Sequence, residues 1–301
     1  MSFQPTIDEI HIDSPGYPRL LREIAAPPQI LYHRGFLPGP SLSLFAIVGT
    51  RKATRDGTSL ARRIARELAE RGFGSVSGLA FGIDAAAHEG TLEGGGKTFA
   101  VLANGLDAIY PTYHERLALD ILHQGGGLLS EYPMGTPALP HHFLERNRIV
   151  AGLALATIVI EAPVRSGALV TARLAAEHGR EVFVFPGPAG HLHYTGSHHL
   201  IRTGARLVSS LADIFEDLQG EFSFHTADPQ PTAGISPHTL SPDEKELCVH
   251  IQQSGSGCTI DQLVVLTGKE PSFINQKLTP LIMKGVVIEK PGGIFVTANS
   301  I

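Results

Sequence analysis

Short apolar runs alternate with amphipathic segments over most of the chain. The run at residues 44–48 ends at Gly49 and is typical of a buried strand, and residues 57–71 carry Leu60, Ile64 and Leu68 at helical spacing. The alternation continues, with strands predicted at residues 74–77, 98–103, 128–130, 157–162, 181–185 and 206–208, and helices at 83–93, 113–123, 143–154, 168–178 and 197–203. This order predicts an α/β fold with a mostly parallel sheet covered by helices on both faces.

Both ends of the chain depart from this pattern. Residues 1–40 are rich in proline and are predicted to be irregular, although residues 29–32 could form an edge strand. Residues 219–240 are polar and have no periodicity, which predicts a linker. Residues 241–301 contain three predicted helices and then two strands, the element order of a winged-helix domain. The main α/β domain is therefore expected at residues 41–218.

Composition narrows the possible functions only slightly. The chain has 301 residues and a formal net charge of -5, so any nucleic-acid site must rest on a local basic surface. Every arginine lies at or before Arg206, which favours the α/β domain as the place of that surface. Cys248 and Cys258 lack metal-ligand spacing, and no metal or cofactor is predicted. Without a signal peptide or a long apolar stretch, we expect a cytoplasmic protein that contacts no membrane.

Small polar residues and arginines gather where the predicted strands end. These residues are Gly49, Thr50 and Arg51, then Ser77 and Gly78, and finally Arg165, Ser166 and Gly167. Ligands of open parallel sheets bind beyond the carboxyl ends of the strands, and the free amides at helix starts favour anions. Several such turns side by side predict a site for a chain of phosphates.

The segment from Phe143 to Arg148 adds a second candidate. Arg146, Asn147 and Arg148 are too polar for the core face of a helix and are predicted to contact the same ligand. Phe143 has two open interpretations, because it could pack as a hydrophobic staple or serve as a platform on which a base stacks.

Taken together, these motifs resemble one known family, the DNA-processing protein A family, also called DprA or Smf. The matching stretches include Ala46-Ile47-Val48-Gly49-Thr50-Arg51, Ser77-Gly78-Leu79-Ala80, Gly82-Ile83-Asp84, Asn104-Gly105-Leu106-Asp107, Ser130-Glu131-Tyr132-Pro133, Arg146-Asn147-Arg148-Ile149 and Ser166-Gly167-Ala168-Leu169. Their order and spacing agree with the family from residue 17 to about residue 218.

The resemblance implies an extended Rossmann-like fold that binds single-stranded DNA without a chemical step and loads the RecA recombinase in natural transformation. It implies a homodimer formed near Leu200 and Ile201, with single-strand-binding protein as a further candidate partner. By the same resemblance, the DNA groove would be lined by Gly49, Thr50, Arg51, Ser77, Gly78, Phe143, Arg146, Asn147, Arg148, Ser166 and Gly167.

Two departures from the family pattern bear on that groove. Phe81 stands where the family often has a basic or polar residue, so a phosphate contact is lost or a stacking surface is gained. Pro140 stands where a basic residue is common, with His141 and His142 beside it. Histidines in that place predict that DNA binding strengthens at acidic pH.

Two other functions remain open from the sequence. A nucleotide-binding phosphoribohydrolase on the same fold could use Glu161 as general base with His88 and Asp84 nearby, although the Pro-Gly-Gly-x-Gly-Thr motif of that family is absent from the α/β domain. The alternative for Glu161 is a helix-cap partner, and for His88 a half-buried structural histidine. A transcription regulator is disfavoured, because the presumed recognition helix at 271–284 has only Lys277 and Lys284 as basic residues.

Overall fold

The computed structural model describes residues 6–218, 242–254, 257–283, 287–290 and 294–297. The chain divides into two compact units, residues 1–229 and 230–301. The predicted linker at residues 219–240 lies outside the described residues. Over the described ranges, no helix combines the length and apolar character that crossing a bilayer requires.

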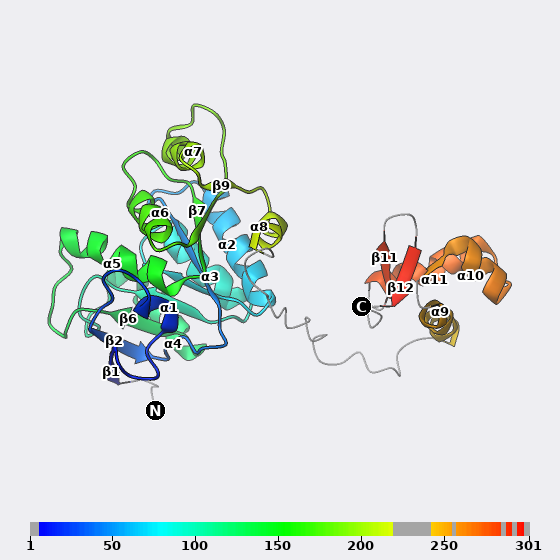
Figure 1. Ribbon diagram of the computed structural model, residues 1–301, viewed down its shortest axis with the longest axis horizontal. Helices are drawn as coiled ribbons and strands as arrows, with labels where there is room; N and C mark the ends of the chain where they lie inside the picture. The colour runs from blue at the N-terminus through cyan, green and yellow to red at the C-terminus, as the bar shows by residue number, and fades with distance from the viewer. Residues whose placement is uncertain (1–5, 219–241, 255–256, 284–286, 291–293, 298–301) are drawn as a thin grey trace. The chain divides into compact units, whose positions relative to one another are not determined.

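The described part of the first unit is built around one nine-stranded sheet (Figure 1). In spatial order its strands are β1 (Ile7–His11), β2 (Ile30–Gly35), β6 (Gly127–Ser130), β5 (Thr98–Val101), β4 (Gly74–Ser77), β3 (Leu44–Gly49), β7 (Ala156–Ile160), β8 (Glu181–Val184) and β9 (Arg206–Leu207). The strands from β6 to β9 pair in parallel, whereas β1 and β2 are antiparallel. The predicted Rossmann-like α/β fold is confirmed.

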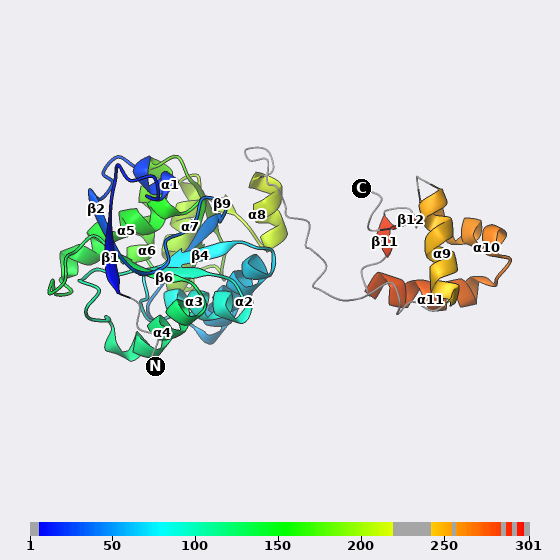
Figure 2. The same cartoon turned by 90° about the horizontal axis from the view of Figure 1, so that it is seen from below.

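Helices cover both faces of this sheet. They are α1 (Arg19–Arg22), α2 (Arg55–Glu70), α3 (Ile83–Glu93), α4 (Glu115–His123), α5 (Pro140–Leu153), α6 (Gly167–Glu177), α7 (Thr195–Arg202) and α8 (Leu211–Leu218), with 3-10 turns η1 (Thr112–His114) and η2 (Leu192–Tyr194). Figure 2 shows α1, α5, α6 and α7 on one side of the sheet and α2, α3 and α4 on the other.

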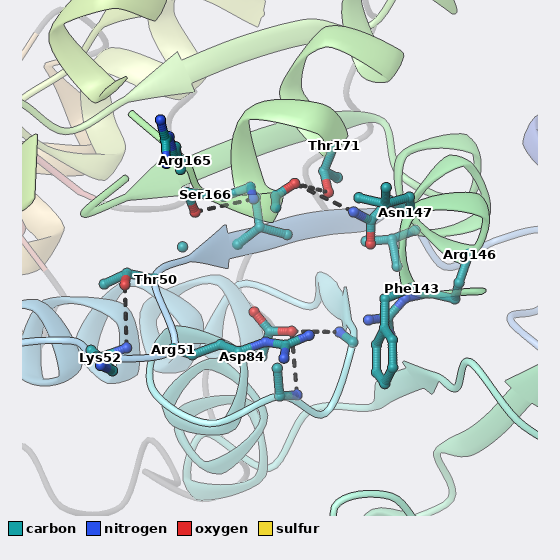
Figure 3. A pocket seen from close by; sticks show the side chains of 18 of the residues that line it. Thr50, Arg51, Lys52, Asp84, Phe143, Arg146, Asn147, Arg165, Ser166 and Thr171 are labelled. Carbon is teal, nitrogen blue, oxygen red and sulfur yellow. Dashed lines mark hydrogen bonds between the residues drawn. The ribbon is translucent and has the colours of Figure 1, made fainter. Parts of the chain in front are cut away.

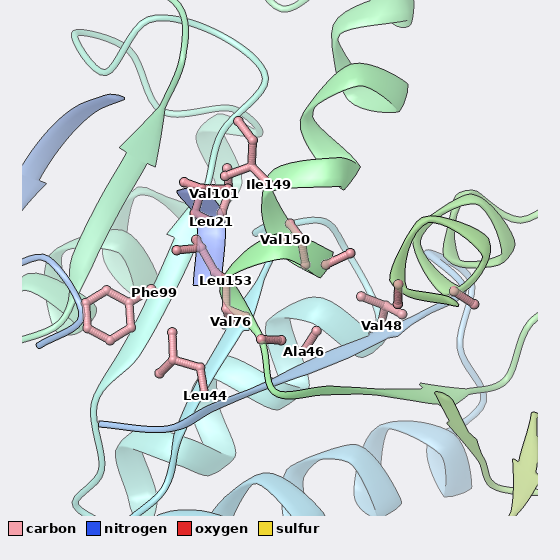
Figure 4. Packing of buried hydrophobic residues seen from close by; sticks show 14 of the residues in the cluster. Leu21, Leu44, Ala46, Val48, Val76, Phe99, Val101, Ile149, Val150 and Leu153 are labelled. Carbon is pink, nitrogen blue, oxygen red and sulfur yellow. The ribbon is translucent and has the colours of Figure 1, made fainter. Parts of the chain in front are cut away.

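Strand β3 shows why the sheet needs two helical layers. Leu44, Ala46 and Val48 belong to the core cluster that includes residues of α5 and α6 (Figure 4). Phe45 and Ile47, which point to the opposite face, belong to the cluster with α2 and α3. Successive side chains of a strand point to opposite faces, so an uninterrupted apolar run requires burial on both.

The amino-terminal segment corrects one prediction. Residues 1–40 are not irregular throughout, because β1, α1 and β2 lie within them and β2 pairs with β6. The edge strand expected at residues 29–32 is part of β2. Leu21 and Leu31 are fully buried, so this segment packs on the main core despite its prolines. Single short elements separated by prolines have too few residues to show a period.

The second unit has a small core of its own. Its described elements are α9 (Pro242–Gln253), β10 (Cys258–Thr259), α10 (Ile260–Thr267), α11 (Pro271–Met283), β11 (Val287–Lys290) and β12 (Ile294–Thr297). The strands form a sheet in the order β10-β12-β11. The three predicted helices and two strands are present, together with the short strand β10, and identification of this unit as a winged helix stays a prediction.

Candidate functional site

A pocket of about 610 Å3 lies at the carboxyl ends of β3 and β7. The chain reaches β4, β5 and β6 on one side of β3 and then returns to place β7 on the other side, so the pocket lies at the topological switch point of the sheet. Figure 3 shows Thr50, Arg51 and Lys52 on the loop after β3, with Arg165 and Ser166 on the neighbouring loop after β7.

Most of the predicted site residues line this pocket. They are Gly49, Thr50, Arg51, Gly78, Phe143, Arg146, Asn147, Arg165, Ser166 and Gly167. Residues that also line it and were not predicted for the DNA groove include Lys52, Asp84, Tyr110, Leu144 and Thr171. Lys52 directly follows the Gly-Thr-Arg motif, so its position was the signal that could have identified it.

The loop after β3 is fixed from both ends. A Cβ atom on Gly49 would lie 2.0 Å from the backbone oxygen of Ile160, so only glycine fits there. The amide of Thr50 donates to the backbone oxygen of Glu161 at 2.8 Å, and its hydroxyl accepts from the amide of Lys52 at 3.2 Å. These contacts leave the Arg51 and Lys52 side chains exposed at the pocket.

Glu161 holds the end of this loop where α2 begins. Its buried carboxylate accepts from the amide of Thr54 at 2.8 Å, from the Thr54 hydroxyl and from the Tyr194 hydroxyl at 2.9 Å. Thr54 is the N-cap of α2 and accepts from the amide of Gly57. The interpretation of Glu161 as a helix-cap partner is confirmed. Burial, and then the bond to Glu161, raises the pKa of Tyr194 to about 12.

Arg146 is buried, although it was predicted to contact phosphate. Its guanidinium donates to the backbone oxygen of Val101. It also packs against Gly78, because a Cβ atom added to Gly78 would lie 2.3 Å from a terminal nitrogen of Arg146. Asp84 accepts from the amides of Gly78 and Ala80 at 3.1 and 3.4 Å.

The charges of Arg146 and Asp84 support each other inside the protein. Burial lowers the pKa of Arg146 to about 10 while the charge of Asp84 opposes that shift. Burial raises the pKa of Asp84, and Arg146 acts in the opposite direction. Arg146 therefore positions the loop after β4 in addition to lining the pocket.

Phe143 lies on the pocket wall and is half-buried. The Arg51 guanidinium is 5.0 Å from the centre of its ring, and the Tyr110 ring is 5.6 Å away. A cation over an aromatic face is an attractive contact, so Arg51 and Phe143 orient each other. The pocket thus places an aromatic ring in contact with a positive charge, and the interpretation of Phe143 as a stacking platform stays a prediction.

The opposite wall is the start of α6. Ser166 is the N-cap of α6 and accepts from the amide of Ala168 at 3.2 Å, and Asn147 donates to the backbone oxygen of Gly167 at 3.3 Å. Arg165 is exposed. Among the residues that the structure describes, Arg51, Lys52 and Arg165 have no ion-pair partner. The pocket therefore carries three uncompensated positive charges on its rim.

Three predicted residues do not line the pocket. Arg148 instead forms a two-bond ion pair with Glu131, at 2.6 Å for each bond. The buried Ser77 hydroxyl donates to the backbone oxygen of Ile47 at 2.7 Å, so it holds β4 against β3. Phe81 is exposed on the loop before α3. The guanidinium of Arg148 is bonded to Glu131 and the hydroxyl of Ser77 to Ile47, so neither polar group is available to a ligand. The sequence alone does not show these contacts.

The histidines also differ from expectation. His88 is fully buried, not half-buried, and its Nδ1 lies 2.7 Å from the Thr98 hydroxyl. Burial lowers the pKa of His88 from 6.5 to about 3.

Of the pair His141 and His142, only His141 is exposed. The ring of His142 stacks on that of Tyr132, with 4.1 Å between the ring centres. Neither lines the pocket, and the acid dependence that they predict stays a prediction.

The two residues expected at a dimer interface lie on α7. Leu200 and Ile201 are half-buried and pack against the core cluster that includes α5 and α6. Part of each side chain is therefore buried within its own chain.

Within the described ranges, no three histidine, cysteine or acidic side chains are grouped so that they could hold a metal ion.

Comparison with known proteins gives a consistent family. Residues 9–219 match the family model described as DNA recombination-mediator protein A. The chain is 38% identical to protein Smf of Escherichia coli over 96% of this chain and 77% of that protein. It is 42% identical to DNA processing protein DprA of Streptococcus pneumoniae over 67% of this chain and 71% of that protein.

Two solved structures of DNA processing protein A are similar to this chain. The X-ray structure of DNA processing protein A from Streptococcus pneumoniae superposes with a TM-score of 0.65 at 40% identity and covers 73% of this chain and 76% of that one. DNA processing protein A from Helicobacter pylori, described for its single-stranded DNA binding mode, superposes with a TM-score of 0.63 at 29% identity, covering 72% and 97%.

Proposed function

Because the chain belongs to the DNA recombination-mediator protein A family, the DprA and Smf proteins, we propose that it binds single-stranded DNA in the pocket at the carboxyl edge of its sheet. One observation carries the proposal: Arg51, Lys52 and Arg165, which have no ion-pair partner among the described residues, line the same pocket as Phe143, and Arg51 contacts its ring. Cations attract phosphates and an aromatic face stacks on a base, so the pocket offers a partner for both parts of a nucleotide.

The shape of the site favours a single strand over a duplex. Phe143 lies within a concave pocket, and a base must leave its stack before it can reach an aromatic ring there. The bases of a duplex are stacked on both faces and shielded by two backbones. The relative from Helicobacter pylori, described as binding single-stranded DNA, provides independent support.

Binding without a chemical step is the better proposal for the acids near the pocket. Asp84 accepts bonds from the loop that carries it, and Glu161 is saturated by Thr54 and Tyr194. A general base needs a lone pair directed at a substrate proton, and these carboxylates direct theirs at their own scaffold. For the phosphoribohydrolase alternative, the carboxylate of Asp84 or Glu161 would first have to lose its hydrogen bonds to the protein.

The wider role follows from the family alone. We propose that the protein protects incoming single strands and loads RecA onto them in natural transformation, in the cytoplasm, with single-strand-binding protein as a further partner. We further propose a homodimer through α7, where Leu200 and Ile201 keep part of their surface exposed. The second unit, proposed to be a winged helix, would then serve partner docking more than duplex reading.

The test compares two arginine variants that carry the same substitution. Arg51→Ala should weaken binding to a fluorescent homopolymer oligonucleotide and lower the slope of log affinity against log salt by about 0.7, the value for one phosphate contact on a single strand. Arg148→Ala is the matched control, because its guanidinium pairs with Glu131 outside the pocket.

Fluorescence anisotropy at several salt concentrations gives both quantities. Wild type should also prefer the single strand over a duplex of equal length. Equal affinities of wild type and Arg51→Ala would place the DNA elsewhere. Weaker binding in both folded variants would instead support the groove predicted from the sequence, which includes Arg148. Circular dichroism establishes that both variants are folded.

A further inference from the structure

Two exposed aromatic rings form a ledge outside the pocket. Phe81 is 45% exposed and Tyr113 81% exposed, and their ring centres are 5.7 Å apart. They come from different loops, Phe81 from the loop before α3 and Tyr113 from η1. Two large rings from separate loops leave apolar surface exposed to water, and such surface commonly marks a binding site. We call this pair the Phe81–Tyr113 ledge.

The ledge is held in place from below. The ring of buried His114 lies 4.7 Å from the ring of Phe81, and its Nδ1 donates to the backbone oxygen of Leu79 at 2.7 Å. That bond joins η1 to the loop before α3. Gly82, with a φ of 78°, ends this loop at the N-cap of α3. A ligand therefore meets a preformed surface and does not have to order it.

The two loops that carry the ledge also contribute residues to the pocket. Ala80, next to Phe81 in the chain, lines the pocket, and so does Tyr110, three residues before Tyr113. Tyr110 is 49% exposed and contacts Phe143. Aromatic side chains thus occur along the two loops from the inner wall of the pocket to the ledge.

A second depression, of about 590 Å3, borders the ledge and limits how far a strand can continue. Its two arginines are already paired, Arg62 with Glu89 at 2.6 Å and Glu93 at 3.2 Å, and Arg116 with Asp120 at 3.2 Å. The three carboxylates of Glu89, Glu93 and Asp120 outnumber the two arginines, so the net negative charge of this depression repels phosphate. Phosphates are therefore favoured only on the pocket side, while the ledge itself offers uncharged aromatic surface.

We propose that the Phe81–Tyr113 ledge is a second stacking station for the same single strand, where a base that leaves the pocket stacks without a charged contact. The inference rests on the proposed function and extends it to a further part of the ligand. Because every base has a flat face, the station should accept any sequence. Its contribution should also be independent of salt, which separates it from the contribution of Arg51.

The first experiment measures affinity against oligonucleotide length. Phe81→Ala and Tyr113→Ala should each weaken binding of a long thymidine oligonucleotide by about fivefold or more, from the stacking energy of one base, with the salt slope unchanged. A short oligonucleotide that fills only the pocket should bind each variant like wild type. Tyr113→Phe should retain full affinity. Phe36→Ala is the matched control, because Phe36 is 57% exposed on a different loop.

A second experiment observes the ledge directly. The chain contains no tryptophan, so Tyr113→Trp introduces a single fluorescent indole at the ledge. Its emission should be quenched by the long oligonucleotide and left unchanged by the short one. Unchanged emission with the long oligonucleotide, together with wild-type affinity of both alanine variants, would overturn the ledge while leaving the proposed function intact. Failure of wild type to bind either oligonucleotide would overturn both.

Discussion

Four arginines near the proposed site differ because of their neighbours. Arg51 and Arg165 are exposed at the pocket rim, whereas Arg146 is buried beside Asp84 and Arg148 pairs with Glu131. The Arg148 guanidinium must lose its bonds to Glu131 before it can neutralise a phosphate, and the Arg146 guanidinium already donates to the backbone oxygen of Val101. At the scale of single residues, the exposed arginines are therefore the ones expected to set the salt dependence of binding.

The buried His88 gives a prediction about stability. Its pKa is about 3 in the folded protein and 6.5 when the ring is exposed on unfolding, so the unfolded chain binds the extra proton first as the pH falls. The stability that the neutral ring contributes is present above pH 6.5 and is lost between pH 6.5 and 3.

Chemical denaturation at pH 7 and pH 5 measures this effect. From pH 7 to pH 5 the free energy of unfolding of wild type should fall by about 2 kcal/mol more than that of His88→Gln, which cannot titrate. Parallel losses in the two proteins would show that another group is responsible.

At the scale of elements, the loop after β3 depends on a contact with the end of β7. Thr54 caps the 16-residue helix α2 while its own amide and hydroxyl donate to Glu161. The two loops that form the rim of the pocket are joined at this point. A change at Glu161 should therefore affect the start of α2 and the position of Arg51 together.

Glu161→Gln tests this contact and the enzyme alternative at once. The side-chain nitrogen of glutamine cannot accept, so a buried donor loses its partner, and unfolding should become easier by about 1–3 kcal/mol. Glu177→Gln, exposed on α6, is the control and should change little. A wild type that releases free base from nucleotides, with that activity lost in Glu161→Gln at unchanged stability, would support the hydrolase instead.

At the scale of the whole molecule, the two units have separate cores and separate charges. The cluster formed by α9, α10, α11 and the small sheet contains no residue of the first unit. In the second unit, Lys269 pairs with Asp243 and Glu246, and Lys277 lies 3.9 Å from Asp243. Positive charges that are compensated in this way contribute little to phosphate binding.

This separation predicts the behaviour of a truncated protein. A fragment of residues 1–218 retains every residue that lines the pocket and should bind a thymidine oligonucleotide within about threefold of the full chain, with the same salt slope. Anisotropy, with circular dichroism as a folding control, measures both. A loss of more than tenfold in a folded fragment would give the second unit a direct share in DNA binding.

The sequence by itself determined the fold class and the edge of the sheet where the site lies. Apolar period and turn residues are local properties, and parallel strands joined by helices must all end at the same edge. The sequence likewise indicated the Gly-Thr-Arg loop, because the apolar run of a buried strand ends at Gly49, and the structure shows that only glycine fits there. It could not indicate β1 and α1, which are too short to show a period.

Only the tertiary structure decided which polar side chains remain available to a ligand. Arg146 is buried beside Asp84, 62 positions earlier, and Arg148 pairs with Glu131, 17 positions earlier, so nothing local distinguishes them from Arg51. The same holds for the ledge, where packing on His114 brings Phe81 next to Tyr113. Ion pairs and ring contacts form between groups that are close in space, and folding alone establishes that proximity.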